Sequence, residues 1–231
     1  MTRLSFIIPV FNEKNTIEEI IHRVQEADLG LQKEIIVVDD GSTDGSKELL
    51  ENMADRNLKI LFHPQNRGKG AALRTGFGEA TGDIICIQDA DLEYDPRDYA
   101  GVLAPILDGR ADASFGSRFL GGPHRVLYFW HYVGNRIVTT FCNMLANLNL
   151  TDIETCYKAI RRDILDRMTL RSNRFGFEPE ITIKLARHRC HLYEVPISYS
   201  GREYAEGKKV TWRDGLAALF HIVRFRFFDK K

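Results

Sequence analysis

Short apolar segments alternate with helical patterns along the first half of the chain, and this alternation restricts the fold more than any other feature. Alternation at such short spacing is typical of a mostly parallel sheet with helices on both faces. Segment 34–38 is apolar after its first residue, as expected of a strand buried on both sides. We therefore predict an α/β fold. The expected strands are 4–10, 34–38, 59–62, 83–88, 111–116 and 193–197.

Helical patterns follow most of these strands. Thr16 and Glu19 have the spacing of a capping box, which predicts that a helix begins there. Asp95 followed by Pro96 is a favourable N-cap and first-turn pair for another helix. Further helices are expected over 44–56, 69–80 and 212–228, and from residues 134 and 175.

Length and charge limit the classes of partner. With 231 residues, of which 44% are hydrophobic, the chain can bury the core of one domain. Lys+Arg and Asp+Glu are both 32, so the overall charge favours no nucleic-acid partner, and any electrostatic specialisation is local. Such a bias occurs at the end, where residues 201–231 hold eight basic and four acidic side chains.

Cysteine usage and hydropathy bear on location. The four cysteines are far apart without a Cys-x-x-Cys pair, and a strand pattern opens the chain without a signal peptide, so we expect a cytoplasmic protein. No apolar run approaches the ~20 residues that span a bilayer. Apolar residues at helical spacing in 212–228 lie beside Arg224 and Arg226. This pattern suits a helix on the cytoplasmic face of an anionic membrane, and equally a helix packed on the sheet.

Polar motifs follow the predicted strands. They occupy residues 9–13, 39–45, 66–70 and 89–95. In open parallel sheets ligands bind beyond the carboxyl ends of the strands, so these four motifs are expected to share one rim. Each alone is also ordinary turn chemistry. Together they predict a ligand site at this edge.

The acidic run after the strand at 83–88 is the most specific of these motifs. Asp89, Asp91 and Glu93 occupy alternate positions, so in an extended segment their side chains point the same way and can converge on one cation. Oxygen ligands suit Mg²⁺ or Mn²⁺. The alternative is a solvated acidic turn. Lys69, at the start of a predicted helix, can attract phosphate, although no P-loop is present.

In this order the motifs resemble those of the family 2 glycosyltransferases of GT-A fold, most closely the dolichol-phosphate mannose or glucose synthase branch. The resemblance extends from Phe6 to about Gly215. It implies a three-layer α/β/α fold and an inverting, metal-dependent enzyme that uses Mg²⁺ or Mn²⁺. It also divides the single domain 1–231 into a nucleotide-sugar-binding half at 1–118, an acceptor half at 119–211 and a C-terminal amphipathic helix at 212–231.

The resemblance assigns roles to individual residues. The metal ligands would be Asp89, Asp91 and Glu93, the last of which stands where relatives often have glutamine. The catalytic and phosphate-binding residues would be Asp152, Arg118, Arg136, Arg202 and Lys209. The nucleotide and its diphosphate would contact Pro9, Phe11, Asn12, Glu13, Val38, Asp40, Lys69, Asp89, Ala90 and Asp91.

The resemblance also implies substrates. The donor would be a nucleotide diphosphate sugar of the GDP-mannose or UDP-glucose type, and the acceptor polyprenyl or dolichyl phosphate or another lipid. A saccharide or other hydroxyl acceptor is the main alternative, and Asp152 would then act as general base. A third alternative is a non-catalytic protein that binds nucleotide sugars. The basic segment from Arg202 to Lys209 is expected to be a lid, and Glu178 or Glu180 either faces the site or caps a helix.

Overall fold

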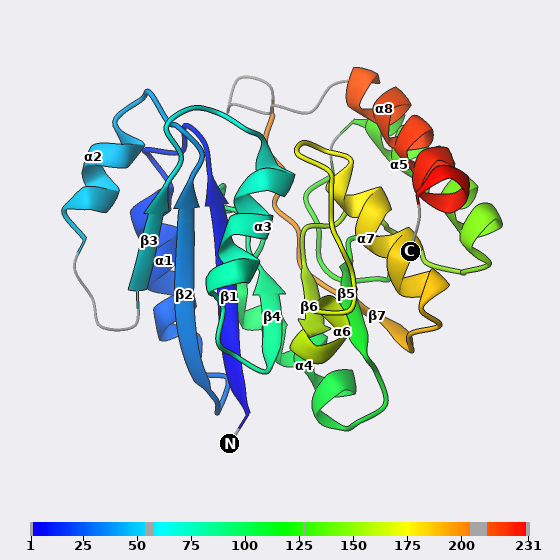
Figure 1. Ribbon diagram of the computed structural model, residues 1–231, viewed down its shortest axis with the longest axis horizontal. Helices are drawn as coiled ribbons and strands as arrows, with labels where there is room; N and C mark the ends of the chain where they lie inside the picture. Colours follow the sequence, from blue (N-terminus) through cyan, green and yellow to red (C-terminus); the bar gives the residue numbers. More distant parts are fainter. Residues whose placement is uncertain (1, 54–57, 127, 204–211, 230–231) are drawn as a thin grey trace.

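A computed structural model describes residues 2–53, 58–126, 128–203 and 212–229. In this part of the chain seven strands form one mixed sheet in the order β3-β2-β1-β4-β6-β5-β7, with helices on both faces (Figure 1). The strands are β1 (Arg3–Val10), β2 (Gln32–Asp39), β3 (Leu58–Phe62), β4 (Ile84–Ile87), β5 (Ala113–Ser117), β6 (Lys158–Arg161) and β7 (Leu192–Pro196). The six predicted strands are confirmed within two residues at each end.

The pairing places most strand ends at one edge. Strands β2, β1 and β4 are parallel neighbours, as are β2 and β3, and Val10 of β1 lies opposite Asp39 of β2. Strand β6 runs antiparallel to both β4 and β5, whereas β5 and β7 are parallel. The carboxyl ends of all strands except β6 therefore point to the same edge, at the top of Figure 1.

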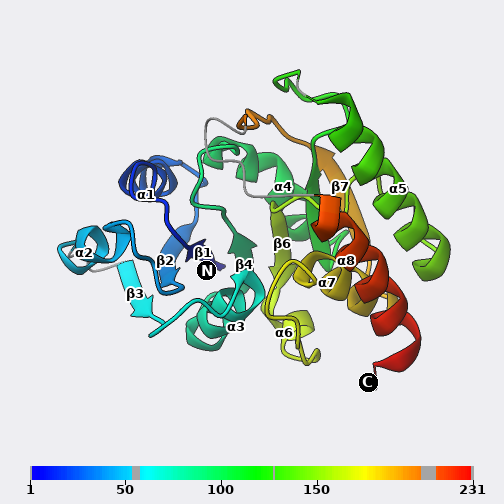
Figure 2. The same ribbon diagram turned by 90° about the horizontal axis from the view of Figure 1, so that it is seen from above.

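Helices complete a three-layer α/β/α arrangement, as expected from the sequence. Helices α1 and α4 cover one face and α3, α6 and α7 the other (Figure 2). Helices α5 and α8 pack against each other and against α7, beside the β5–β7 end. The helices are α1 (Ile17–Glu26), α2 (Ser46–Glu51), α3 (Lys69–Glu79), η1 (Pro96–Asp98), α4 (Tyr99–Leu107), α5 (Phe129–Ala146), α6 (Arg162–Leu165), α7 (Phe177–Arg187), α8 (Trp212–Val223) and the π-helical turn η3 (Arg224–Phe228).

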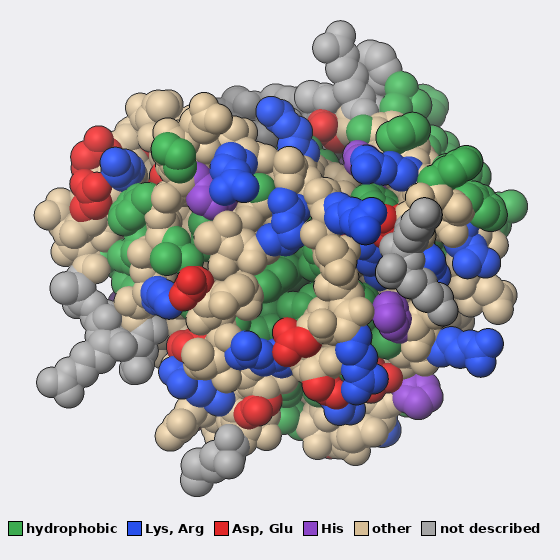
Figure 3. Space-filling model, viewed as in Figure 1, with side chains coloured by type: hydrophobic (Ala, Val, Ile, Leu, Met, Phe, Trp, Pro, Cys, Tyr) green, Lys and Arg blue, Asp and Glu red, His purple; other side chains and the backbone are tan. Residues whose placement is uncertain are grey.

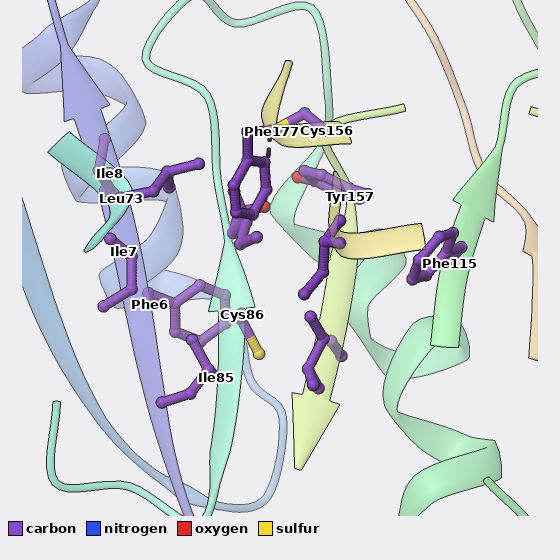
Figure 4. Packing of buried hydrophobic residues seen from close by; sticks show 14 of the residues in the cluster. Phe6, Ile7, Ile8, Leu73, Ile85, Cys86, Phe115, Cys156, Tyr157 and Phe177 are labelled. Carbon is purple, nitrogen blue, oxygen red and sulfur yellow. Dashed lines mark hydrogen bonds between the residues drawn. The ribbon is translucent and has the colours of Figure 1, made fainter. Parts of the chain in front are cut away.

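Aromatic packing in the core fixes the end of β4. Tyr99 contacts Phe6 edge-on, with ring centroids 4.8 Å apart, and Tyr157 at 4.4 Å. Phe6 and Tyr157 both belong to the buried core drawn in Figure 4. The Tyr99 hydroxyl donates to the carbonyl of Ile87, and the Tyr157 hydroxyl donates to Gln88 Oε1 at 2.7 Å. Both partners are buried, so these bonds hold the backbone immediately before the acidic run.

The predicted helix starts are confirmed in part, since α1 begins at Ile17 with Thr16 as its N-cap residue, as expected. The capping box is wrong, because the Thr16 hydroxyl donates to the carbonyl of Glu13 at 3.2 Å and to its side chain at 3.1 Å, and makes no cap bond to α1. Helix α5 begins at Phe129, five residues before the predicted start. The N-cap at Asp95 is confirmed, since its carboxylate accepts from Arg97 N at 2.9 Å.

Candidate active site

A cleft of about 1360 Å³ opens at the carboxyl edge of the sheet. Its floor comes from the loops after β1, β2 and β4 and from the start of α3, and its outer wall from α5 and α8. Most of the sequence-predicted site residues lie along it. They are Pro9, Phe11, Glu13, Asp40, Lys69, Asp89, Ala90, Asp91, Glu93, Arg118 and Arg202.

The first two rim loops both contribute to the cleft and are also tied to each other. Asn12 N donates to Ser42 Oγ at 3.0 Å, and the Asn12 amide oxygen accepts from Thr43 N at 2.8 Å. Gly41 has φ 73°, and a Cβ there would lie 2.5 Å from the carbonyl carbon of Gln65, so a side chain would clash. Asn12 thus joins loops and does not line the cleft. Val38 does not reach it either, because it is buried within β2.

Asp40 organises the entry to α3. Its carboxylate accepts from His63 Nδ1 at 2.6 Å and from Gly68 N at 2.6 Å, and from Arg67 N at 3.0 Å. His63, whose other ring nitrogen lies 2.9 Å from Thr75 Oγ1, was not predicted from the sequence. The buried Asp40–His63 pair therefore fixes the loop that immediately precedes the first residue of α3.

Lys69, that first residue, lies between two carboxylates. Its Nζ is 2.8 Å from Asp89 Oδ1 and 3.2 Å from Glu178 Oε1. Burial disfavours the charged ammonium, but these carboxylates outweigh it and raise the pKa of Lys69 well above its ordinary value. The side chain is thus a fixed cation beside the acidic run.

Arg202 brings the second half of the chain to the acidic run. Its guanidinium donates to Asp91 Oδ2 at 3.0 Å and to both oxygens of Glu13 at 3.2 and 3.3 Å. Its backbone N donates to Glu93 Oε1 at 3.0 Å, and Glu93 also accepts from the Tyr199 hydroxyl at 2.8 Å. A single guanidinium is therefore surrounded by three carboxylates.

The predicted metal ligands are not gathered into one set in this conformation. Within the described ranges, no three carboxylate, histidine or cysteine side chains are close enough together to hold a metal ion. The reason is their pairing, since Asp91 and Glu93 contact Arg202 whereas Asp89 contacts Lys69.

The donor set nevertheless fits a hard divalent cation. Burial, together with repulsion from Asp89 and Glu93, raises the pKa of Asp91 to about 7 despite the opposing charge of Arg202. The carboxylates thus exceed the positive charge around them, and all the donor atoms are oxygen. Mg²⁺ and Mn²⁺ prefer such ligands.

Arg118 and Asp152 form a buried bidentate pair. Arg118 Nε donates to Asp152 Oδ2 at 2.6 Å and Nη2 to Oδ1 at 2.8 Å, while Asn135 Nδ2 donates to Oδ1 at 3.1 Å. Burial opposes the carboxylate charge, but Arg118 outweighs it and lowers the pKa of Asp152. Arg118 lines the cleft, whereas Asp152 lies behind it, fully buried. Asp152 thus orients the arginine.

Other predicted residues lie elsewhere. Arg136 is exposed on α5 outside the cleft, and its neighbour Asn135 lines the cleft instead, because one helical step turns a side chain by roughly 100°. Lys209 lies outside the described residues. Glu178 lines the cleft, whereas Glu180 accepts from Ser172 N at 2.7 Å and pairs with Lys184 at 2.7 Å.

Several cleft residues were not predicted from the sequence. Most of them lie in irregular segments, where no periodicity marks them, whereas His131 lies in the first turn of α5. Glu154 had one available signal, because it stands two residues after Asp152 in an acidic loop. The unpredicted polar residues of the lining include His124, Arg125, His131, Glu154 and Arg174.

The outer wall of the cleft is apolar and largely exposed. Trp130 of α5 is 77% exposed, and Leu216 of α8 is 56% exposed. Helix α8 buries Ala218 and Ile222, and packs against α5 and α7 rather than on the sheet. Figure 3 shows hydrophobic side chains gathered over α5 and α8, at the upper right. Among the described helices, none has the length and hydropathy needed to cross a membrane.

The sheet order and the acidic edge define a GT-A glycosyltransferase fold, and solved structures bear this out. Glucosyl-3-phosphoglycerate synthase from Mycobacterium tuberculosis, solved with Mn²⁺, UDP and phosphoglyceric acid, superposes with a TM-score of 0.75 at 19% identity, over 100% of this chain and 80% of that chain. Mannosyl-3-phosphoglycerate synthase from Rubrobacter xylanophilus gives 0.72 at 18% identity, over 97% and 73%.

The chain belongs to glycosyl transferase family 2, whose family model matches residues 5–169. It is 28% identical over 213 residues to dolichol-phosphate mannosyltransferase of Pyrococcus furiosus, covering 89% of this chain and 59% of the relative. It is 29% identical over 211 residues to undecaprenyl-phosphate 4-deoxy-4-formamido-L-arabinose transferase of Salmonella paratyphi B, covering 89% and 62%. The chain thus spans about three fifths of the length of these curated relatives.

Proposed function

We propose that this chain carries the catalytic domain of an inverting, metal-dependent glycosyltransferase. It moves a hexose from a nucleotide diphosphate sugar, of the GDP-mannose or UDP-glucose type, to a polyprenyl phosphate. The observation that carries the proposal is the cleft, in which the charged sheet edge is continuous with the apolar wall of α5 and α8. A sugar diphosphate requires the first part and a lipid chain the second. The names of the two curated relatives support the acceptor class.

The charged end of the cleft suits the donor. Asp89, Asp91 and Glu93 would hold Mg²⁺ or Mn²⁺. The bound cation would neutralise the negative charge that develops on the departing diphosphate. Lys69 adds a fixed cation at the N-terminus of α3, where backbone N–H groups also favour phosphate. Arg202 adds a second cation at the same edge. In this proposal residues 1–118 supply most of the donor contacts and 119–211 most of the acceptor contacts.

The arrangement around Asp152 favours a phosphate acceptor over a hydroxyl acceptor. A hydroxyl requires a general base, and Asp152 is a poor one, because Arg118 occupies both its oxygens and lowers its pKa. A phosphate is already ionised. Its oxygen attacks the anomeric carbon from the face opposite the departing nucleotide, and this direct displacement inverts the configuration. Arg118, held in place by Asp152, is the residue we assign to the acceptor phosphate.

The apolar wall supports peripheral association with the cytoplasmic face of a membrane. Phe220 of α8 is 65% exposed and stands four residues after Leu216, on the same face of the helix, and Arg224 and Arg226 follow it as exposed cations. Aromatic and apolar residues beside cations suit the interface of an anionic bilayer, where a polyprenyl phosphate is met.

A donor screen tests the proposal. The protein is incubated with polyprenyl phosphate, Mg²⁺ or Mn²⁺, and labelled UDP-glucose or GDP-mannose, and the label is followed into the organic phase. Metal-dependent appearance of organic-extractable sugar is expected with one donor. Transfer into water-soluble saccharides alone would favour the hydroxyl-acceptor alternative, and no turnover of either donor would contradict the proposal.

A further inference from the structure

Two carboxyl groups on the cleft floor have oxygens that lack a partner among the described residues. They are Glu154 Oε1, in the loop before β6, and Glu178 Oε2, in the first turn of α7. Glu178 is only 4% exposed, and both residues line the cleft. A buried acceptor without a donor is destabilising, so this floor is suited to a ligand that supplies hydrogen-bond donors.

The neighbours of Glu178 place it next to the residues that we assign to the donor diphosphate. Lys69 contacts Glu178 at 3.2 Å and Asp89 at 2.8 Å, so a single ammonium separates Glu178 from the acidic run. Lys158, the other buried cation nearby, donates instead to the carbonyls of Ile153 and Thr155. Lys158 therefore leaves both oxygens without a hydrogen bond, in two residues that line the cleft.

The two carboxyls also differ in their surroundings. Burial, with repulsion from Glu178, raises the pKa of Glu154 to about 8. At neutral pH Glu154 is therefore mostly a neutral acid that can donate and accept a hydrogen bond, whereas Glu178 Oε1 contacts the Lys69 ammonium at 3.2 Å and Oε2 lacks a donor. This combination matches sugar hydroxyls, each of which donates one hydrogen bond and accepts others.

We propose that Glu154 and Glu178 form the subsite that binds the hydroxyls of the donor hexose. The inference rests on the proposed function and adds the residues that recognise the sugar ring. A site built to hydrogen-bond a hydroxyl leaves its own polar groups unpaired when the substrate lacks that hydroxyl, so it discriminates strongly against deoxy analogues. The rival role is structural, with both carboxylates serving only to balance Lys69 and Lys158.

Calorimetry of nucleotide binding, carried out without acceptor, distinguishes a sugar-binding role of the two glutamates from a structural role. UDP, UDP-glucose, GDP and GDP-mannose are titrated with Mn²⁺ into the wild type, Glu154→Gln and Glu178→Gln. Glu34→Gln is the matched control, because it alters a largely buried carboxylate among Ser5, Thr81 and Gly82, outside the cleft lining. Each cleft variant should bind the preferred nucleotide sugar about tenfold or more weakly while its affinity for the free nucleoside diphosphate changes little.

Deoxy donors give the decisive comparison. The analogues are forms of the preferred donor that each lack one ring hydroxyl. The analogue that lacks the hydroxyl contacted by Glu154 or Glu178 should bind the wild type weakly. The variant of that glutamate should bind this analogue with little further loss of affinity. Equal losses for nucleotide sugar, free nucleotide and every deoxy form would overturn the subsite and support the structural role. Failure of UDP and GDP alike to bind the wild type would overturn the proposed function itself, which is a distinguishable result.

Discussion

At the scale of single residues, buried charge pairs set the geometry of the site. Arg118 reaches the cleft only because Asp152, thirty-four positions later, holds its guanidinium through two hydrogen bonds. Removing one partner of such a pair leaves an uncompensated buried charge, which is far more costly than removing both. The pair therefore couples stability to the position of a proposed catalytic side chain.

Arg118→Met should lower the free energy of unfolding by about 3 to 5 kcal/mol, because Asp152 is left buried without its counter-ion. The double variant with Asp152→Asn should recover a large part of this loss. Urea unfolding of the wild type, the two single variants and the double variant measures these values. Strictly additive losses in the double variant would contradict the pairing.

Asp152 also predicts a pH dependence. Its pKa is lower in the folded protein than in the unfolded chain, so its stabilising contribution is fully present above the unfolded value. The contribution is lost as the pH falls through the folded pKa. Between neutral and strongly acidic pH, the free energy of unfolding should therefore fall less for Asp152→Asn than for the wild type. Parallel pH profiles for the two proteins would rule this out.

Asp91→Asn should abolish transfer while leaving the fold intact. Without metal, the substitution relieves repulsion from Asp89 and Glu93, and Arg202 keeps its contacts with Glu13. The melting temperature without metal should therefore be unchanged or higher. Transfer assays with Mn²⁺ and thermal melts measure the two effects, and near-normal turnover would exclude Asp91 as a ligand.

At the scale of elements, α8 shows how one helix divides its apolar residues between two environments. Ala218 and Ile222 are buried against neighbouring helices, whereas Leu216 and Phe220 remain exposed. The sequence predicted the helix and its apolar spacing. Which side is covered depends on α5 and α7, and therefore on contacts between distant segments.

Replacement of both Leu216 and Phe220 by serine should weaken binding to anionic vesicles, with little change in melting temperature, because both side chains are already exposed. Leu107→Ser is the control, since that residue is 47% exposed at the end of α4, outside the cleft lining. Vesicle co-sedimentation gives the comparison. Equal retention of binding by both variants would contradict the assignment of this surface.

The strands of the parallel half could be predicted from local pattern, and β6 could not. Ile84–Ile87 is a continuous apolar run, whereas β6 is short and carries charge at both ends, in Lys158 and Arg161. Its strand conformation comes from antiparallel pairing with β4 and β5, which lie many residues earlier. Tertiary pairing thus decided the conformation of this segment.

At the scale of the whole molecule, the fold joins opposite ends of the chain in one site. Arg202 contacts Glu13, 189 positions earlier, and Arg74 donates to Ser172, 98 positions later. The acidic rim could be predicted because its residues are close in sequence. Lys69 and Arg202 were also predicted as site residues, Arg202 through the family resemblance. Their pairing with this rim, and the cleft position of Glu154, depend on long-range packing that no local pattern records.

Mn²⁺ and a nucleoside diphosphate together should stabilise the protein by more than the sum of their separate effects, because each supplies charge that the other needs. Binding at a hundredfold excess over Kd adds about 2.7 kcal/mol to the free energy of unfolding. Thermal melts with EDTA, Mn²⁺, UDP or GDP, and their combinations, test this expectation. Shifts that merely add would contradict a shared metal–diphosphate site.

The acceptor is tested most directly by comparing polyprenyl phosphate with the polyprenol of equal chain length, using the donor identified in the screen. Mass spectrometry of the lipid extract records which acceptor gains a hexose. Arg118 in the cleft and Asp152 held away from it predict a hexosyl product from the phosphate and none from the alcohol. Equal transfer to both, or transfer to the polyprenol alone, would contradict a phosphate acceptor.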